Sequence, residues 1–598
     1  MWEFLLIVTA TANVVFGQIE DVNAQLFNDR QFEGAGVKSR LTTTGTNYVA
    51  GVVANALVVH FADVRLPPKT FQLQNAPTVT VSNTSLTSFR LLPNTFSSLT
   101  ADGLLHFRAT NVAISTKSTV RGVLRGVPLA HQLLVDTAKA QLEVSLRVIK
   151  QANGNPAFKM TSCSVRAPSA NGDAIPKLSP QNERNLMEAL MRELGAVFGK
   201  LMCPRIANIL DTRINQRFSL LSSKISLEET TNFDIVRSIL RAEEKLKRLV
   251  RQNLQVGDVV RRTLSSRRDI HARLRRQVQR VRQMNWPAGQ QRLMLRAPPV
   301  WNSFWNRRKR QEKFHLIVNT FNISRATSLR LDFAMLSAPL LTPNGIEIMT
   351  NGEIAAVGQS TPFGARPMSL PPPNPQNMLQ TVVSDFVPNS LLFHGHKTGM
   401  FDTRVDWNTA QLGPMMRTTC DLTTGSLFCV GDLFPTLRDS VPDKRLAFLF
   451  TTLSAPAVIV RPEQLGGIGF SLVGLIDIVT EDEQHVGQMQ INITANMKMR
   501  LTSTAVKGRV AVDDIVLKTR TPQILVQEEL DDAGFLSREI LQRMVNDILK
   551  QGVPIPVHPL FKLVKPKLTL GNRSLVLETN FSLNEHIIRQ LTAENLTV

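Results

Sequence analysis

Apolar residues recur at helical spacing in four segments of the chain, residues 40–61, 183–203, 376–392 and 533–550. Apolar positions three and four residues apart predict a helix with one apolar face. Between the two helices of each half, apolar and polar residues alternate, which predicts strands. Each half therefore repeats one plan of helix, strands and helix, and we expect two similar α+β domains.

The alternation is clearest at residues 142–148 and 489–501, where every second residue is apolar. Such strands bury one face and leave the other in water. Asn492 falls on the polar face of the second strand and begins an Asn-x-Ser/Thr motif. The six motifs of this kind are expected glycosylation sites: Asn83, Asn322, Asn492, Asn572, Asn580 and Asn595.

The first 17 residues predict a secretory signal peptide. The apolar stretch that ends at Phe16 is too short to span a membrane, and the small Val15 and Gly17 suit a signal peptidase. No later stretch offers the roughly 18 uncharged apolar residues that a membrane span needs. We expect a secreted, extracellular protein.

Four cysteines in an oxidising compartment predict two disulfides. Cys420 and Cys429 flank a stretch typical of a tight hairpin, so that Cys163 pairs with Cys203. Neither pair has the two-residue spacing or the nearby histidines of a zinc site, and no metal is expected.

Motifs for catalysis are weak. The run Gly466 to Gly469 lacks the third glycine of a dinucleotide loop, and neither His-Glu-x-x-His nor Gly-x-Ser-x-Gly occurs. The pair His394 and His396 is predicted to lie in a surface turn. We expect no enzyme and no cofactor.

A basic segment, residues 236–313, joins the two halves. Between Arg237 and Lys313 lie 22 Lys or Arg and five acids, a charge of +17 out of the chain's +21. Three interpretations stay open: a solvated linker, basic amphipathic helices that bind an anionic lipid surface, and, less favoured, a nucleic-acid site. The expected anionic-surface residues are Arg273, Arg275, Arg276, Arg280 and Arg282.

Clustered basic residues within this segment resemble processing sites of proprotein convertases. The sharpest is Arg307, Arg308, Lys309 and Arg310. Neither predicted disulfide spans it, so cleavage would leave the halves without a covalent link. Chance occurrence in so basic a stretch is the alternative.

Several stretches together resemble the family of bactericidal/permeability-increasing protein and lipopolysaccharide-binding protein, to which the cholesteryl ester and phospholipid transfer proteins are similar. They are Arg40 to Tyr48, the Cys163/Cys203 pair, Ser384 to Leu392, and Leu536 to Pro556. The resemblance covers about residues 35–225 and 325–590. It implies a boomerang of two similar domains, each a twisted antiparallel sheet or barrel with two long helices, joined by a central sheet.

The expected organisation is a signal peptide (1–17), an N-terminal lipid-binding domain (18–235), the basic insert (236–313), a central sheet connection (314–365) and a C-terminal lipid-binding domain (366–598). Taken alone, the apolar faces of the predicted helices are expected to pack in an ordinary hydrophobic core. The resemblance instead favours contact of these faces with lipid. The expected pocket residues are Val49, Val52, Val53, Leu57, Leu190, Leu194, Phe198, Val382, Val383, Phe386, Leu541, Val545 and Ile548.

The sequence thus predicts a secreted protein that holds phospholipid-type acyl chains and recognises lipopolysaccharide or transfers lipid. The alternative is a structural or interaction protein whose Arg-rich insert binds glycosaminoglycan or nucleic acid.

Overall fold

The computed structural model divides the chain into two compact units, Met1–Ile239 with Ser324–Val598, and Leu240–Ile323. Every residue that the structure describes lies in the first unit. The described residues are 21–58, 65–66, 68–72, 78–91, 96–124, 127–166, 171–175, 199–200, 202–227, 325, 328–409, 412–420, 429–502, 505–534, 537–538, 542, 546, 553–554 and 560–593.

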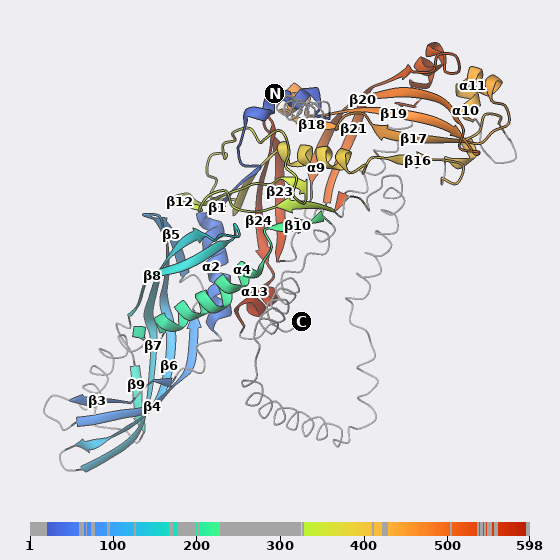
Figure 1. Ribbon diagram of the computed structural model, residues 1–598. Helices are drawn as coiled ribbons and strands as arrows, with labels where there is room; N and C mark the ends of the chain where they lie inside the picture. Colours follow the sequence, from blue (N-terminus) through green and yellow to red (C-terminus); the bar gives the residue numbers. More distant parts are fainter. Residues whose placement is uncertain are drawn as a thin grey trace, which may run out of the picture. The chain divides into compact units, whose positions relative to one another are not determined.

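The N-terminal half is built on an eight-stranded antiparallel sheet in the order β2-β4-β6-β7-β8, with β3, β5 and β9 paired alongside (Figure 1). Its strands are β2 (Arg65–Leu66), β3 (Lys69–Gln72), β4 (Thr78–Leu91), β5 (Phe96–Ala101), β6 (Leu104–Leu124), β7 (Val127–Lys150), β8 (Pro156–Arg166) and β9 (Asn171–Ile175). The predicted alternation at residues 142–148 is confirmed within β7, where Val144, Leu146 and Val148 are buried.

Two helical stretches accompany this sheet. The first is α2 (Thr43–Val58). The second is helical at the described residues 202–209 and continues through a π-helical turn, η3 (Leu210–Asn215), into α4 (Gln216–Leu220). The predicted end at residue 203 was therefore too early. Its Met202, Ile206 and Leu210 pack into the buried cluster of the sheet.

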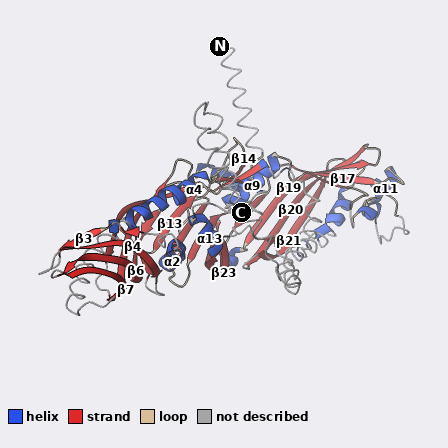
Figure 2. Ribbon diagram, turned by 90° about the horizontal axis from the view of Figure 1, so that it is seen from below, coloured by secondary structure: helices blue, strands red, loops and turns tan. Residues whose placement is uncertain are grey.

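The C-terminal half carries a seven-stranded antiparallel sheet in the order β16-β17-β19-β20-β21-β22, with β18 paired to β19 (Figure 2). Its strands are β16 (Thr403–Val405), β17 (Leu446–Thr452), β18 (Ala457–Val460), β19 (Ile468–Thr480), β20 (His485–Leu501), β21 (Ala505–Thr519) and β22 (Val553–Pro554). Its short helices are η5 (Gly413–Met415), α10 (Val430–Leu433), α11 (Pro435–Ser440) and η7 (Glu463–Leu465).

Residues 527–534, 537–538, 542 and 546 are helical as well. The last predicted helix is thus confirmed where it is described, and it begins six residues earlier than expected. The strand prediction for residues 489–501 is confirmed by β20.

A six-stranded antiparallel sheet combines strands from both ends of the chain, in the order β12-β13-β1-β15-β24-β23. It is built from β12 (Leu340–Thr342), β13 (Gly345–Thr350), β1 (Val37–Thr42), β15 (Leu379–Ser384), β24 (Ser574–Leu583) and β23 (Phe561–Leu570). A separate three-stranded sheet contains β10 (Lys224–Ser226), β11 (Leu329–Asp332) and β14 (Ile354–Ala356). The expected central sheet is confirmed, and the mixture of helices with antiparallel sheets confirms the α+β class.

Of the two expected forms, a twisted sheet or a barrel, the sheet is confirmed, because each sheet of the described residues runs as an open path of strands. In the two large sheets, side chains of helical residues bind the backbone of β8 and β21 where a barrel would need another strand.

Two predicted helices were partly wrong. Residues 40–42 belong to strand β1, and α2 begins only at Thr43. Residues 379–384 form strand β15, and the helix of that region is α9 (Phe386–Lys397). The second error arises because a short apolar run with two valines suits a strand as well as a helix. The first is an error of boundary at Arg40 and Thr42, which are buried polar residues of β1.

A buried ionic cluster fixes the N-terminal segment to the C-terminal half. Asp29, in the 3₁₀ helix η1 (Ala24–Gln31), pairs with Arg573 between β23 and β24 and with Arg366 at 2.6 Å. Arg573 also pairs with Asp385, which precedes α9. The side chains of Asp29 and Asp385 are only 3% and 2% exposed. Burial raises the pKa of Asp385, although the guanidinium of Arg573 opposes this.

Replacing Arg573 by Met leaves two buried carboxylates without their shared cation. We expect the free energy of unfolding to fall by about 3–5 kcal/mol. The matched control is Arg589→Met in α13 (Glu585–Thr592), where an exposed pair with Glu585 is lost and the expected change is below about 0.5 kcal/mol. Urea unfolding of both variants measures the difference, and equal midpoints would show that the cluster does not hold the segment.

A cut in the basic insert should leave the halves assembled. Strand β1 lies between β13 and β15, whereas each disulfide joins cysteines on one side of the insert. Protein cut at residues 307–310 should elute on native size exclusion at the volume of uncut protein. It should give two bands on a denaturing gel without reductant. Separate elution of two fragments under native conditions would show that β1 does not hold them.

Candidate lipid-binding surfaces

Helix α2 carries no charged residue along its length. It is anchored at its start: Thr42 Oγ1 accepts the Gly45 N–H at 3.3 Å, and a Cβ at Gly45 would lie 2.3 Å from the Met378 carbonyl oxygen. Tyr48 packs edge-on against Phe581 at 5.8 Å, and its hydroxyl accepts the Leu583 N–H at 3.0 Å. One turn later, three valines remain half-buried: Val49, Val52 and Val53.

The sheet of the N-terminal half presents an apolar face on the side of its core. Val144 and Leu146 are fully buried there. Other apolar side chains that pack against the same cluster remain half-buried: Phe107, Leu142, Phe158 and Met160. Leu142 belongs to the strand predicted at residues 142–148. None of the four was expected in the pocket, because the expected pocket residues all come from the helix stripes.

The sheet of the C-terminal half shows the same arrangement. One face of β19 and β20 is apolar, with the pairs Leu472/Ile493 and Ile476/Met489 in register. Ile478 and Met489 are buried at one end of that face. Toward the other end the apolar residues are only half-buried: Phe470, Leu472, Ile491, Ile493 and Met497. The polar residues of β20 lie on the opposite face, so this row is apolar and incompletely covered.

The structure places the predicted pocket residues in different elements. Val49, Val52 and Val53 lie on α2 as expected, and Leu57 lies on the same helix. Val382 and Val383 are strand residues, and Val382 is 1% exposed within the six-stranded sheet. Phe386 begins α9 and packs edge-on against Phe363. Leu190, Leu194, Phe198, Leu541, Val545 and Ile548 lie outside the described residues.

His394 and His396 do not form a surface turn, because both lie in α9. His394 is 1% exposed and contacts Thr361 Oγ1 at 3.2 Å through Nε2, while its Nδ1 has no partner. Burial lowers its pKa and keeps the ring neutral. His396 contacts Thr452 Oγ1 at 2.6 Å, and burial lowers its pKa too, against the hydrogen bond to Asp21. The two rings point to different neighbours and form no joint site.

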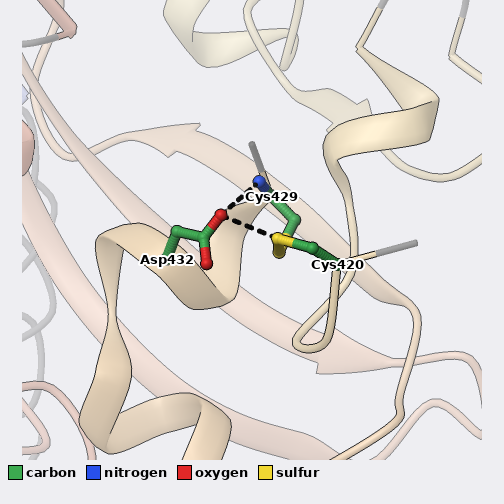
Figure 3. A group of neighbouring side chains, drawn as sticks. All are labelled: Cys420, Cys429 and Asp432. Carbon is green, nitrogen blue, oxygen red and sulfur yellow. Dashed lines mark hydrogen bonds between the residues drawn. A yellow bond between two sulfur atoms is a disulfide. The ribbon is translucent and has the colours of Figure 1, made fainter. Parts of the chain in front are cut away.

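Both predicted disulfides are present, Cys163–Cys203 and Cys420–Cys429. The carboxylate of Asp432 lies 2.7 Å from Cys420 Sγ and accepts the Cys429 N–H at 3.2 Å (Figure 3). In the described part of the chain these three side chains form the one cluster of potential metal ligands. Since the two sulfurs are bonded to each other, neither is a thiolate ligand, and the carboxylate serves to cap α10.

Of the glycosylation motifs, Asn83 and Asn572 are exposed, and Asn492 and Asn580 are half-buried. The remaining motifs, Asn322 and Asn595, lie outside the described residues, as do the predicted anionic-surface and processing residues. No helix among the described residues is long and apolar enough to cross a membrane.

Comparisons with known proteins agree with this architecture. Residues 323–583 match the model of the LBP / BPI / CETP family, C-terminal domain. No curated protein sequence matches the chain. Among solved structures, a lipopolysaccharide binding protein is similar with a TM-score of 0.50 and 14% identity, over 92% of this chain and 99% of that one. This likeness shows the fold.

Two further structures align over smaller parts. Takeout 1 of Epiphyas postvittana has a TM-score of 0.17 and 10% identity, over 29% of this chain and 92% of that one. Mmm1 has a TM-score of 0.11 and 11% identity, over 27% and 69%. At these TM-scores neither structure supports a conclusion about the fold of this chain. The family model shows that residues 323–583 form the C-terminal domain of the LBP / BPI / CETP family, and the likeness to a lipopolysaccharide binding protein shows that the rest of the chain shares that protein's fold.

Proposed function

We propose that this chain is an extracellular lipid-binding protein that holds phospholipid-type acyl chains against the apolar faces of its two large sheets. The observation that carries the proposal is the half-buried apolar row of β19 and β20, Phe470 to Ile476 and Ile491 to Met497. Leaving such surface in contact with water costs about 25 cal/mol per Å². An acyl chain laid along the row would remove that cost without needing any polar partner.

The half-buried valines of α2 support a second site of the same kind in the N-terminal half. The LBP / BPI / CETP family domain at residues 323–583 favours lipid over other apolar ligands. No catalytic role is proposed, because apolar rows bind and orient but transfer no protons.

The basic insert would recruit anionic head groups, including the phosphates of lipopolysaccharide. Each Lys or Arg near an anionic surface contributes about 1 kcal/mol. The alternative, an interaction protein that binds an anionic polymer through the insert, rests on the same +17 charge. Deleting residues 236–313 separates the two functions: a lipid carrier keeps its bound lipid, whereas the interaction protein loses its binding.

The test is native and then denaturing mass spectrometry of protein from a secretory host, purified without delipidation. We expect about two phospholipids per chain, one for each apolar face. Ile493→Asn places an unpaired amide in the β20 row and should reduce this to about one. The matched control is Lys498→Asn, an exposed position on the polar face of the same strand, which should retain both. Wild-type protein with no lipid, and none taken up from phosphatidylglycerol vesicles, would contradict the proposal.

A further inference from the structure

In both halves, an asparagine side chain of a helix forms hydrogen bonds with the backbone of a strand at the edge of the sheet. Asn215, at the end of η3, accepts the Phe158 N–H at 2.8 Å and donates to the Phe158 carbonyl oxygen at 2.8 Å. Asn546 accepts the Val510 N–H at 2.7 Å and donates to the Val510 carbonyl oxygen at 2.8 Å. The side-chain amide in each case replaces the neighbouring strand that β8 or β21 lacks at that residue.

Two glutamine side chains form further hydrogen bonds with the backbone of β21. Gln542 accepts the Val512 N–H at 2.9 Å. Gln527 accepts the Thr519 N–H at 3.1 Å and donates to the Leu517 carbonyl oxygen at 2.7 Å. Together with Asn546, these side chains bind both ends of the strand edge. We call this line of contacts, from Asn546/Val510 to Gln527/Thr519, the β21 seam.

The spacing shows that helix and strand run antiparallel. Gln527 binds Thr519, Gln542 binds Val512 and Asn546 binds Val510, so the partners descend along β21 as the helical residues ascend. In the N-terminal half, Cys203 to Asn215 corresponds to about 18 Å of helix, and Phe158 to Cys163 to about 17 Å of strand. The two seams therefore share one geometry, in which Cys163–Cys203 occupies a place that amides occupy in the β21 seam.

This difference decides how each seam opens. The disulfide keeps the helix at the edge of β8 even when water replaces the hydrogen bonds between Asn215 and Phe158. The described polar contacts of the β21 seam are all hydrogen bonds to the backbone, and beside them Leu530 and Ala533 pack in the same buried cluster as Leu517. No described disulfide joins this helix to β21, so both kinds of contact can be lost as the helix moves away. The apolar row of β19 and β20 belongs to the same sheet as β21.

We propose that the β21 seam is the entry site through which an acyl chain reaches the apolar face of the C-terminal sheet, while the disulfide keeps the matching seam of the N-terminal half closed. This inference rests on the proposed lipid-binding function. Gln527, Gln542 and Asn546 are then positioning residues that set how often the C-terminal site opens.

The experiment follows release of a pyrene-labelled phosphatidylcholine from the full chain into excess unlabelled vesicles. Asn546→Asp keeps the shape of the side chain but sets a carboxylate oxygen against the Val510 carbonyl oxygen. We expect release from one of the two sites to become about tenfold faster, with unchanged lipid content at the start. Arg538→Gln, an exposed change in the same helical stretch, is the matched control and should leave the rate unaltered.

The same substitution at Asn215 tests the role of the disulfide, and its effect should stay below twofold while Cys163–Cys203 is intact. Lipid bound by the wild type but released at one rate by all variants would overturn the entry site and leave the proposed function standing. Absence of lipid from the wild type would overturn both.

A measurement on the unaltered protein covers the case in which Asn546→Asp fails to fold. Amide hydrogen exchange should be faster at Val510 and Val512 than at Phe158, because only the β8 seam carries a covalent link. Equal protection of the two strand edges would contradict the proposal.

Discussion

The fold depends on one long-range pairing: strand β1 must enter a sheet whose neighbouring strands lie far along the sequence. Arg40 meets Glu347 after 307 residues and Gln380 after 340. Contacts of such separation make folding slow, because the entropy of closing a long loop is lost before the contact forms. Once the sheet exists, lengthening the loop costs little, since this entropy grows only with the logarithm of length. A long basic insert is therefore compatible with the fold.

A row of polar side chains crosses this sheet and specifies its register alongside the apolar packing. Glu347, Arg40, Gln380 and Glu578 stand opposite one another on four successive strands. Arg40 binds Glu347 at 2.8 Å and Gln380 at 3.1 Å, and Gln380 donates to Glu578 at 2.9 Å. A slip of one residue would turn this buried row to the other face and leave its charges unpaired. The row thus excludes alternative pairings that the valine-rich strands alone would permit.

What the sequence predicted well were long alternating strands, such as β20, and the pairing of four cysteines. It failed where Val382 and Val383 mimic a helical stripe inside strand β15, since the periodicity of so short an apolar run does not separate a helix from a strand. It also missed the burial of His394, whose contact Thr361 lies in the segment between β14 and β15. Asn215 and Asn546 gave no signal, because an asparagine inside a helix acquires its role only when a strand edge lies beside it.

Acyl chains gain about 0.8 kcal/mol per methylene on leaving water, whether they enter a bilayer or a protein. Exchange between the two is therefore nearly neutral in free energy, and the barrier to opening governs its rate. The β21 seam contains five described hydrogen bonds. At about 1 kcal/mol net for each bond replaced by water, the hydrogen bonds alone add about 5 kcal/mol to the cost of opening, which slows exchange by at least about three orders of magnitude. Exposing Leu530 and Ala533, which are buried against β21, raises this cost further. A disulfide adds a covalent restraint to this barrier, so two faces of similar chemistry would hold lipid for different times.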